Sequence, residues 1–197
     1  MYFMEILIRP GFDESQRIRA AELFWQAFRG KLGKLMGPDD RAIHFFAQSL
    51  DPNFVFTAQD SSGCLLGMAG FKTSDGTFAD GTFDDLRQVY GTWGAIWRAL
   101  TLSIFERPVA PDVLLMDAIC VSADARGLGV GTRLLDRIKE EARQRGLTQV
   151  RLDVIDTNPR AQALYEREGF KAGPVQSAWP LRRVLGFNQS TTMIWRG

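Results

Sequence analysis

The sequence is poor in histidine and cysteine and has no surplus of either charge. Its 197 residues include one histidine and two cysteines, and 24 basic residues are balanced by 23 acidic ones. No His/Cys cluster has the spacing of metal ligands, so the sequence predicts no metal site. The balanced charge argues against a nucleic-acid partner, because nucleic-acid-binding proteins carry clustered basic residues. Cys64 and Cys120 both fall in apolar segments, which is typical of reduced, buried thiols rather than of a disulfide framework.

Long hydrophobic runs are also missing. The first nine residues have no basic region and no long apolar core, so they do not form a secretion signal. The longest mostly apolar stretch, from Trp93 to Phe105, is interrupted by Arg98 and is too short to span a bilayer. These absences favour a cytoplasmic protein with no membrane partner.

What remains is the composition of an ordinary globular protein, with 45 % hydrophobic and 24 % charged residues. The length suits one well-packed domain over residues 1–197. Hydrophobic periodicity and turn residues predict both strands and helices. The expected strands cover residues 5–9, 54–58, 64–71, 113–121, 150–154, 170 onward and 191–195, and the expected helices cover residues 18–32, 39–50, 129–145 and 158–168, with Gly30, Gly33 and Gly37-Pro38 breaking up the end of the first. The second and third strands form a hairpin over residues 60–63.

A glycine-rich segment, Arg126 to Thr132, lies between the strand at 113–121 and the following helix. Glycines at alternate positions let an anion approach the backbone N–H groups, and the helix start adds unpaired N–H groups and the positive end of its dipole. The segment does not match a P-loop, in which Lys and then Ser or Thr follow the last glycine. Here Thr132 and Arg133 follow Gly131. The segment does not match the dinucleotide fingerprint G-x-G-x-x-G either, because Thr132 stands where the third glycine is required. The segment still predicts a phosphate-binding turn.

A second motif lies downstream at residues 158–170, and the two motifs together are more specific than the glycine-rich segment alone. The two together resemble the GNAT acetyltransferases. Arg126, Gly129 and Gly131 match that family's pyrophosphate motif, which reads Arg or Gln, two residues, Gly, one residue, and Gly or Ala. The downstream motif N-x-x-A-x-x-L-Y-x-x-x-G-F is met at Asn158, Ala161, Leu164, Tyr165, Gly169 and Phe170.

The resemblance implies an α/β (α+β) fold with a mixed, mostly antiparallel sheet of about six or seven strands flanked by helices. It implies acetyl-CoA as co-substrate, with the pantetheine arm paired to the strand at 119–121 and the pyrophosphate held mainly by backbone amides. Under that resemblance the cofactor-binding residues are Ile119, Cys120, Val121, Arg126, Gly127, Leu128, Gly129, Val130, Gly131, Thr132 and Asn158. Asn158 is equally suited to cap the helix that begins at Pro159, and the two roles are compatible.

Acetyl transfer to an amine needs a neutral amine, a polarised thioester and a proton or hydrogen bond for the departing thiolate. The resemblance makes Tyr165 the candidate for the last role, against the alternative of a half-buried packing residue. Asp117 is the candidate general base, because a carboxylate among Leu115, Ile119 and Val121 could have a raised pKa. It could instead bind a neighbouring loop or the acceptor's ammonium group. His44 falls on the polar side of its helix and is expected at the surface.

Residues 73–112 form an insert where the family pattern has a short turn. Its apolar residues step by four and three, which predicts a helix, and they are Leu86, Tyr90, Trp93, Trp97, Leu100 and Ile104. The helix could pack on the domain's own sheet, cover the acceptor as a lid, or form a seam in a homodimer, since an exposed aromatic stripe is costly.

The resemblance therefore implies an N-acetyltransferase that transfers acetyl from acetyl-CoA to a primary amine of a small molecule or peptide in a ternary complex. A non-catalytic acyl-CoA-binding module, or an interaction protein acting through the insert, is the alternative. The acceptor pocket is expected among residues 30–38, 83–105 and 176–188. Arg182 and Arg183 lie there and would favour a carboxylate-bearing acceptor, unless both are solvated.

Overall fold

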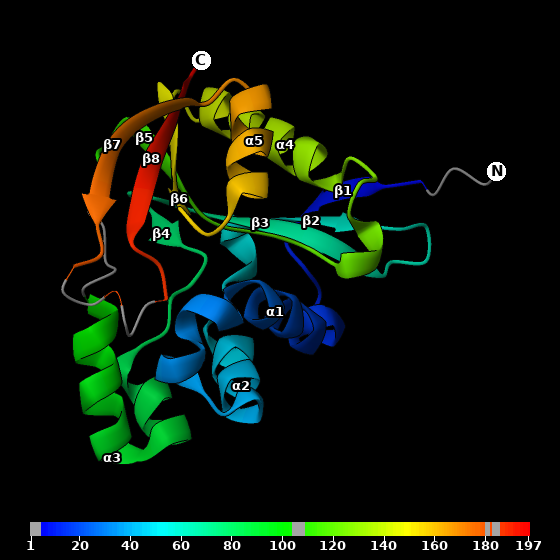
Figure 1. The fold of residues 1–197 in the computed structure, drawn as a ribbon. Helices are drawn as coiled ribbons and strands as arrows, with labels where there is room; N and C mark the ends of the chain where they lie inside the picture. The colour runs from blue at the N-terminus through cyan, green and yellow to red at the C-terminus, as the bar shows by residue number, and fades with distance from the viewer. Residues whose placement is uncertain (1–4, 104–108, 180–181, 183–185) are drawn as a thin grey trace.

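One mixed sheet organises the chain, with helices on both of its faces (Figure 1). The structure is a computed structural model, and it describes residues 5–103, 109–179, 182 and 186–197. In chain order the elements are β1 (Leu7–Pro10), α1 (Arg17–Met36), α2 (Asp39–Ser49), β2 (Val55–Gln59), β3 (Leu65–Thr73), β4 (Gly76–Thr77), α3 (Phe83–Leu102), β5 (Val113–Val121), α4 (Val130–Gln144), β6 (Gln149–Ile155), α5 (Pro159–Arg167), β7 (Lys171–Ser177) and β8 (Gln189–Arg196).

The strand order is β1-β2-β3-β5-β6-β8-β7, with β4 paired to β3. Every neighbouring pair is antiparallel except β5 and β6, which are parallel. The predicted mixed, mostly antiparallel sheet is thus confirmed. It has eight strands rather than six or seven, because the two-residue β4 adds to the end of β3.

The predicted hairpin joins β2 and β3. The Asp60 carboxylate accepts hydrogen bonds from the backbone N–H groups of Ser62 and Cys64, and Gly63 has a φ of 84°. Cys64 belongs to this turn and is exposed, so the expectation that it is a buried strand residue was wrong. Its amide is used to close the turn, and the buried strand begins one residue later at Leu65.

Helix α1 does not break at Gly30 or Gly33, contrary to the sequence-based expectation. It continues to Met36 and ends at Gly37. A glycine inside a helix costs about 1 kcal/mol relative to alanine, which burial of one large apolar side chain offsets. The buried side chains of α1 supply several such contributions: Leu23, Phe24, Trp25, Leu35 and Met36.

The insert contains β4 and α3, and the predicted aromatic stripe divides at Gly91, where the helix is kinked at a φ of 71°. Before the kink, Tyr90 is buried and its hydroxyl donates a hydrogen bond to the carbonyl of Met36. Beyond it, Trp93 is 84 % exposed and Leu100 67 % exposed. Of the three predicted alternatives, packing on the domain's own sheet was wrong, because the buried part of the helix lies against α2 (Figure 1). Ile104 lies outside the described residues.

Candidate active site

The sheet opens between its two parallel strands. Strands β5 and β6 pair only over Val113–Leu115 and Gln149–Arg151, although β5 continues to Val121 and β6 to Ile155. Beyond these pairs, β5 is bonded to β3 on its other side and β6 to β8. The facing backbone edges are therefore available to a ligand that lies between the strands, because backbone N–H and C=O groups need partners.

Asp117 lies in a β-bulge at this opening. Ala118 pairs with Gly70 and Met116 pairs with Phe71, so Asp117 is the extra residue of β5. A bulge shifts the alternation of side chains by one position. Met116 and Ile119 consequently pack in the same hydrophobic cluster, whereas Ala118 belongs to the cluster on the other face. The prediction that Leu115, Asp117, Ile119 and Val121 all share one face was wrong for this reason.

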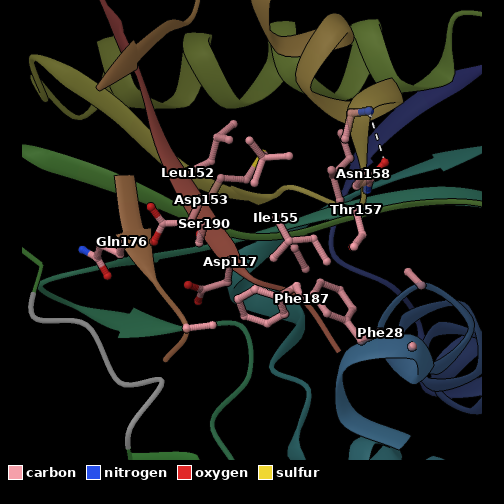
Figure 2. Close-up of a pocket in the computed structure, with 18 of the residues that line it drawn as sticks. Phe28, Asp117, Leu152, Asp153, Ile155, Thr157, Asn158, Gln176, Phe187 and Ser190 are labelled. Atoms are coloured by element: carbon pink, nitrogen blue, oxygen red, sulfur yellow. Dashed lines mark hydrogen bonds between the residues drawn. The ribbon is translucent and has the colours of Figure 1, made fainter. Parts of the chain in front are cut away.

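A cavity of about 630 Å³ occupies the opening. Its wall includes Tyr165 and Val154, which belong to the core beneath α4 and α5. It also includes Phe28 and Ala118, which belong to the core beneath α1 and α2. The cavity thus has walls from both faces of the sheet, and two ligands entering from opposite faces could meet inside it. Figure 2 shows its polar and aromatic residues, among them Asp117, Asp153, Gln176, Phe187 and Ser190.

Among the described residues, Asp117 is the carboxylate whose pKa departs most from its ordinary value. Its Oδ2 accepts a hydrogen bond of 3.0 Å from the Thr77 hydroxyl, which β4 of the insert supplies. Burial raises the pKa of Asp117 to about 6, and the Thr77 hydrogen bond and the charge of Lys72 act in the opposite direction. A carboxylate with this pKa is ionised at neutral pH and can still accept and release a proton, as a general base requires.

Tyr165 lines the cavity from α5, and its ring packs 6.0 Å from that of Phe170. Burial raises the pKa of Tyr165 above its ordinary value of 10, so the hydroxyl keeps its proton at neutral pH. Helix α5 is fixed at its start by Asn158, whose side-chain oxygen accepts a hydrogen bond from the N–H of Ala161. The expected capping role of Asn158 is therefore confirmed, and Asn158 also lines the cavity.

Cys120 is fully buried, and burial raises the pKa of its thiol to about 12. A thiol with that pKa carries almost no thiolate at neutral pH and is a poor nucleophile.

The glycine-rich turn lies at the start of α4. Gly127 and Gly129 have φ values of 83° and 79°, and nothing lies within 4 Å of the position a Cβ would take at either residue. Gly129 is the N-cap of α4, so its turn leads directly into the free N–H groups of the first helical turn. A Cβ at Gly131 would lie 3.0 Å from Leu164, which shows that the start of α4 contacts α5.

The structure brings only some of the predicted site residues together. Asp117, Ile119, Asn158 and Tyr165 line the cavity. The remaining predicted residues are not in the cavity wall: Cys120, Val121, Arg126, Gly127, Leu128, Gly129, Val130, Gly131 and Thr132. The glycine-rich turn is a separate feature, and it lies next to α5 because Gly131 faces Leu164.

Most cavity residues were not identified from the sequence as site residues, among them Phe28, Asp153, Gln176 and Phe187. The alternation of Val150, Leu152 and Val154 places Asp153 on the opposite face of its strand, but the separation of β5 and β6 is what turns that face into a cavity wall. Gln176 and Phe187 do fall within the segment 176–188 that was expected to contribute to an acceptor pocket.

His44 is exposed, as expected. Within the described residues, no group of His, Cys, Asp or Glu side chains is arranged to hold a metal ion. No helix in this part of the chain combines the length and apolar character needed to cross a membrane.

The fold is shared by solved structures of N-acetyltransferases. An N-acetyltransferase from Staphylococcus aureus Mu50 superposes with a TM-score of 0.66 at 15 % identity, over 96 % of this chain and all of the other. A ribosomal-protein-alanine N-acetyltransferase from Brucella melitensis gives 0.64 at 17 % identity, over 97 % and 99 %. At such identities the likeness concerns the fold.

Comparison at the level of sequence identifies the family. The model of the Acetyltransferase (GNAT) family matches residues 17–170, and the chain belongs to this family. Among curated relatives, a probable N-acetyltransferase camello of Xenopus tropicalis is 42 % identical over 67 residues, which are 34 % of this chain and 31 % of that protein. A thialysine N-epsilon-acetyltransferase of Bos taurus is 32 % identical over 73 residues, 37 % and 43 % of the two chains. The chain thus matches less than half the length of these two relatives.

Proposed function

We propose that the protein is an N-acetyltransferase that transfers the acetyl group of acetyl-CoA directly to a primary amine in a ternary complex. The observation that carries the proposal is the cavity through the sheet at the β5–β6 opening, with Asp117 and Tyr165 both in its wall. The family to which the chain belongs, and the N-acetyltransferases among its relatives, support the same reaction.

In this proposal acetyl-CoA extends from the glycine-rich turn to the cavity. The pyrophosphate binds the amides of residues 127–132 at the start of α4, with Arg126, which is exposed beside them, pairing with a phosphate oxygen. The pantetheine amides pair with the backbone of Ile119–Val121, an edge of β5 that β6 leaves free. Asn158 lies at the start of α5 near the route and contributes a polar contact.

The chemical step then uses two residues. Asp117 accepts a proton from the acceptor ammonium, directly or through water, and leaves a neutral amine. The amine nitrogen bonds to the thioester carbon and loses its second proton to water, and the C–S bond breaks with its electron pair on sulfur. The Tyr165 hydroxyl donates a hydrogen bond to the thiolate, which then takes a proton from water. An ordinary thiol has a pKa near 8.5. Since burial raises that of Tyr165 above 10, complete proton transfer to sulfur is uphill. The hydroxyl therefore acts mainly by stabilising the developing negative charge.

Direct transfer fits the chemistry of Cys120 as well. A covalent acetyl-enzyme would need an activated nucleophile in the cavity. Cys120 is not in the cavity wall, and its raised pKa keeps it a neutral thiol.

The cofactor site makes a direct prediction. Acetyl-CoA at a hundredfold excess over its dissociation constant should stabilise the protein by about 2.7 kcal/mol, measured by thermal unfolding. Gly129→Asp should abolish this gain, because it puts a negative charge and a strained residue at the N-cap where the phosphates bind.

Gly146→Asp is the matched control. Gly146 follows the other end of α4, has a φ of 70°, and has equally open space around it. Its replacement should cost similar backbone strain and leave the stabilisation by acetyl-CoA intact. If Gly129→Asp keeps the full thermal shift, the pyrophosphate does not bind at this turn.

We also propose that a second copy of the chain covers the exposed face of α3. Trp93, Trp97 and Leu100 lie on that face, with exposures of 84, 44 and 67 %. Apolar surface of this kind is costly in water. Changing Trp93 and Trp97 to Ser should convert a dimer to a monomer in light scattering, whereas Ile18→Ser on exposed α1 surface should not. A wild-type protein that is monomeric at high concentration would leave the lid as the role of α3.

The alternative of a non-catalytic acyl-CoA-binding module predicts binding without turnover. It would keep Gly129 and Gly131 and would not need Asp117 or Tyr165. Release of free thiol from acetyl-CoA in the presence of an amine separates the two, since only the enzyme produces it.

A further inference from the structure

The charged residues described in the cavity wall are both acidic. Asp117 and Asp153 place two carboxylates in it, from neighbouring strands, and Gln176, Ser177 and Ser190 add uncharged polar groups (Figure 2). Among the described residues that line the cavity there is no Lys, Arg or His. One carboxylate suffices for the base of the proposed reaction, so the second has no role in that chemistry.

Asp153 is held in a defined orientation and remains accessible. Its Oδ1 accepts a hydrogen bond of 2.6 Å from the Thr192 hydroxyl on β8, and a quarter of its side chain is exposed. The guanidinium of Arg151 lies 3.8 Å from Oδ2, too far for a hydrogen bond, and Arg151 is not part of the cavity wall. Oδ2 of Asp153 therefore forms a long ion pair with Arg151 and no hydrogen bond that would prevent a closer cation from binding it.

The rest of the wall suits an uncharged spacer between two positive charges. Leu115 and Ile155 present aliphatic surface, and Phe28, Phe187 and Trp179 present aromatic rings. Apolar side chains favour methylene groups, and aromatic rings also attract an ammonium ion.

We infer that the acceptor is a diamine, an amine with a second positively charged group beyond a short aliphatic spacer. This inference rests on the proposed function. The reacting nitrogen lies at Asp117, and the second ammonium binds Oδ2 of Asp153 more closely than the 3.8 Å ion pair with Arg151 does, with Gln176 and Ser190 nearby as hydrogen-bonding groups. A carboxylate at that end of the acceptor would face Asp153 and be repelled. The arginine-based expectation of a carboxylate-bearing acceptor has no support at Arg182, which is exposed and outside the cavity wall. Arg183 lies outside the described residues, so its part of that prediction is not tested.

Three acceptors of equal chain length test the inference in the wild-type protein: 1,4-diaminobutane, n-butylamine and 4-aminobutyrate. They place a positive, a neutral and a negative group at the same distance from the reacting amine. We expect kcat/KM, followed by thiol release, to be at least about tenfold higher for the diamine than for butylamine, the lower end for a hydrogen bond between charged groups. Aminobutyrate should be the poorest of the three. Butylamine or aminobutyrate equal to or better than the diamine would overturn the inference and leave the proposed function standing.

The variant Asp153→Asn assigns the preference to a residue. It keeps the shape of the side chain and an oxygen for the Thr192 hydroxyl, and it removes the charge. The ratio of kcat/KM between diaminobutane and butylamine should fall below about threefold in this variant. Asp84→Asn, at a position 81 % exposed on α3, should keep the wild-type ratio. An unchanged ratio in Asp153→Asn would overturn the assignment to Asp153. Absence of thiol release with all three amines in wild-type protein, together with no stabilisation by acetyl-CoA, would overturn the proposed function and this inference with it.

Discussion

Tyr165→Phe should lower kcat at least about a hundredfold and kcat/KM equally, with acetyl-CoA affinity within a few-fold of wild type. The phenylalanine keeps the ring that packs against Phe170 and removes only the hydroxyl. In the proposed mechanism this hydroxyl stabilises charge that forms on sulfur only in the transition state. Loss of such an interaction affects kcat and kcat/KM together. General-acid or hydrogen-bond assistance of this kind is typically worth about 10²–10⁴-fold.

Tyr90→Phe is the control for loss of a buried hydroxyl. Tyr90 donates a hydrogen bond to the Met36 carbonyl, and it is not in the cavity wall. Its change should lower the free energy of unfolding by about 1 kcal/mol and leave kcat within twofold. A drop of less than threefold in Tyr165→Phe, measured where chemistry limits the rate, would leave Tyr165 as a packing residue and the departing thiolate without an identified donor.

Asp117→Asn should remove the pH dependence of kcat around pH 6 along with most of the activity. Burial raises the pKa of Asp117 to about 6, so the proposed base would be protonated and inactive below that pH and ionised above it. The wild-type kcat should therefore rise with pH through about 6 and then level off. The variant cannot ionise at this position and should show no such limb, while acetyl-CoA binding is retained.

The same pKa has a consequence for stability. The folded protein keeps the Asp117 proton up to about pH 6, whereas the unfolded chain releases it near the ordinary value of 3.8. The folded state thus binds the extra proton between these pH values, and Asp117 makes the free energy of unfolding fall as pH rises across this window. Asp117→Asn should lack this fall and be more stable than wild type at pH 7.

Thr77→Val distinguishes a catalytic carboxylate from a merely structural one. The Thr77 hydroxyl donates to Asp117 and favours its ionised form. Its removal should raise the pKa of Asp117 and move the limb of the kcat profile to higher pH. A profile that neither variant changes would show that the amine loses its proton elsewhere.

The parts of the site that follow local rules could be predicted from the sequence. Gly127 and Gly129 have the positive φ that only glycine adopts easily, and they lead into a helix start, as their spacing indicated. Asn158 before Pro159 caps α5, and the apolar periodicity of α4 matches its buried residues. Each of these features depends on neighbours within a few positions along the chain.

The parts that depend on how strands meet could not be predicted. The bulge at Asp117 depends on the register between β5 and β3, and the opening depends on where β5 and β6 stop pairing. When neither the bulge nor the opening is known, the sequence indicates only that Asp153 is a polar residue of an alternating strand. The kink at Gly91 could not be predicted either, because a glycine inside a helical pattern is usually tolerated. The heptad-like spacing of the apolar residues continues across Gly91 and did not indicate a kink.

The central claim is that acetyl passes directly from acetyl-CoA to an amine within the cavity. The measurement that tests it is mass spectrometry of a reaction containing the protein, isotopically labelled acetyl-CoA and 1,4-diaminobutane, with free thiol counted in parallel. The account predicts labelled N-acetyl diamine in amounts equal to the thiol released, and no labelled protein when the amine is omitted. Labelled protein at Cys120, or folded protein that binds acetyl-CoA and releases no thiol with any amine, would contradict it.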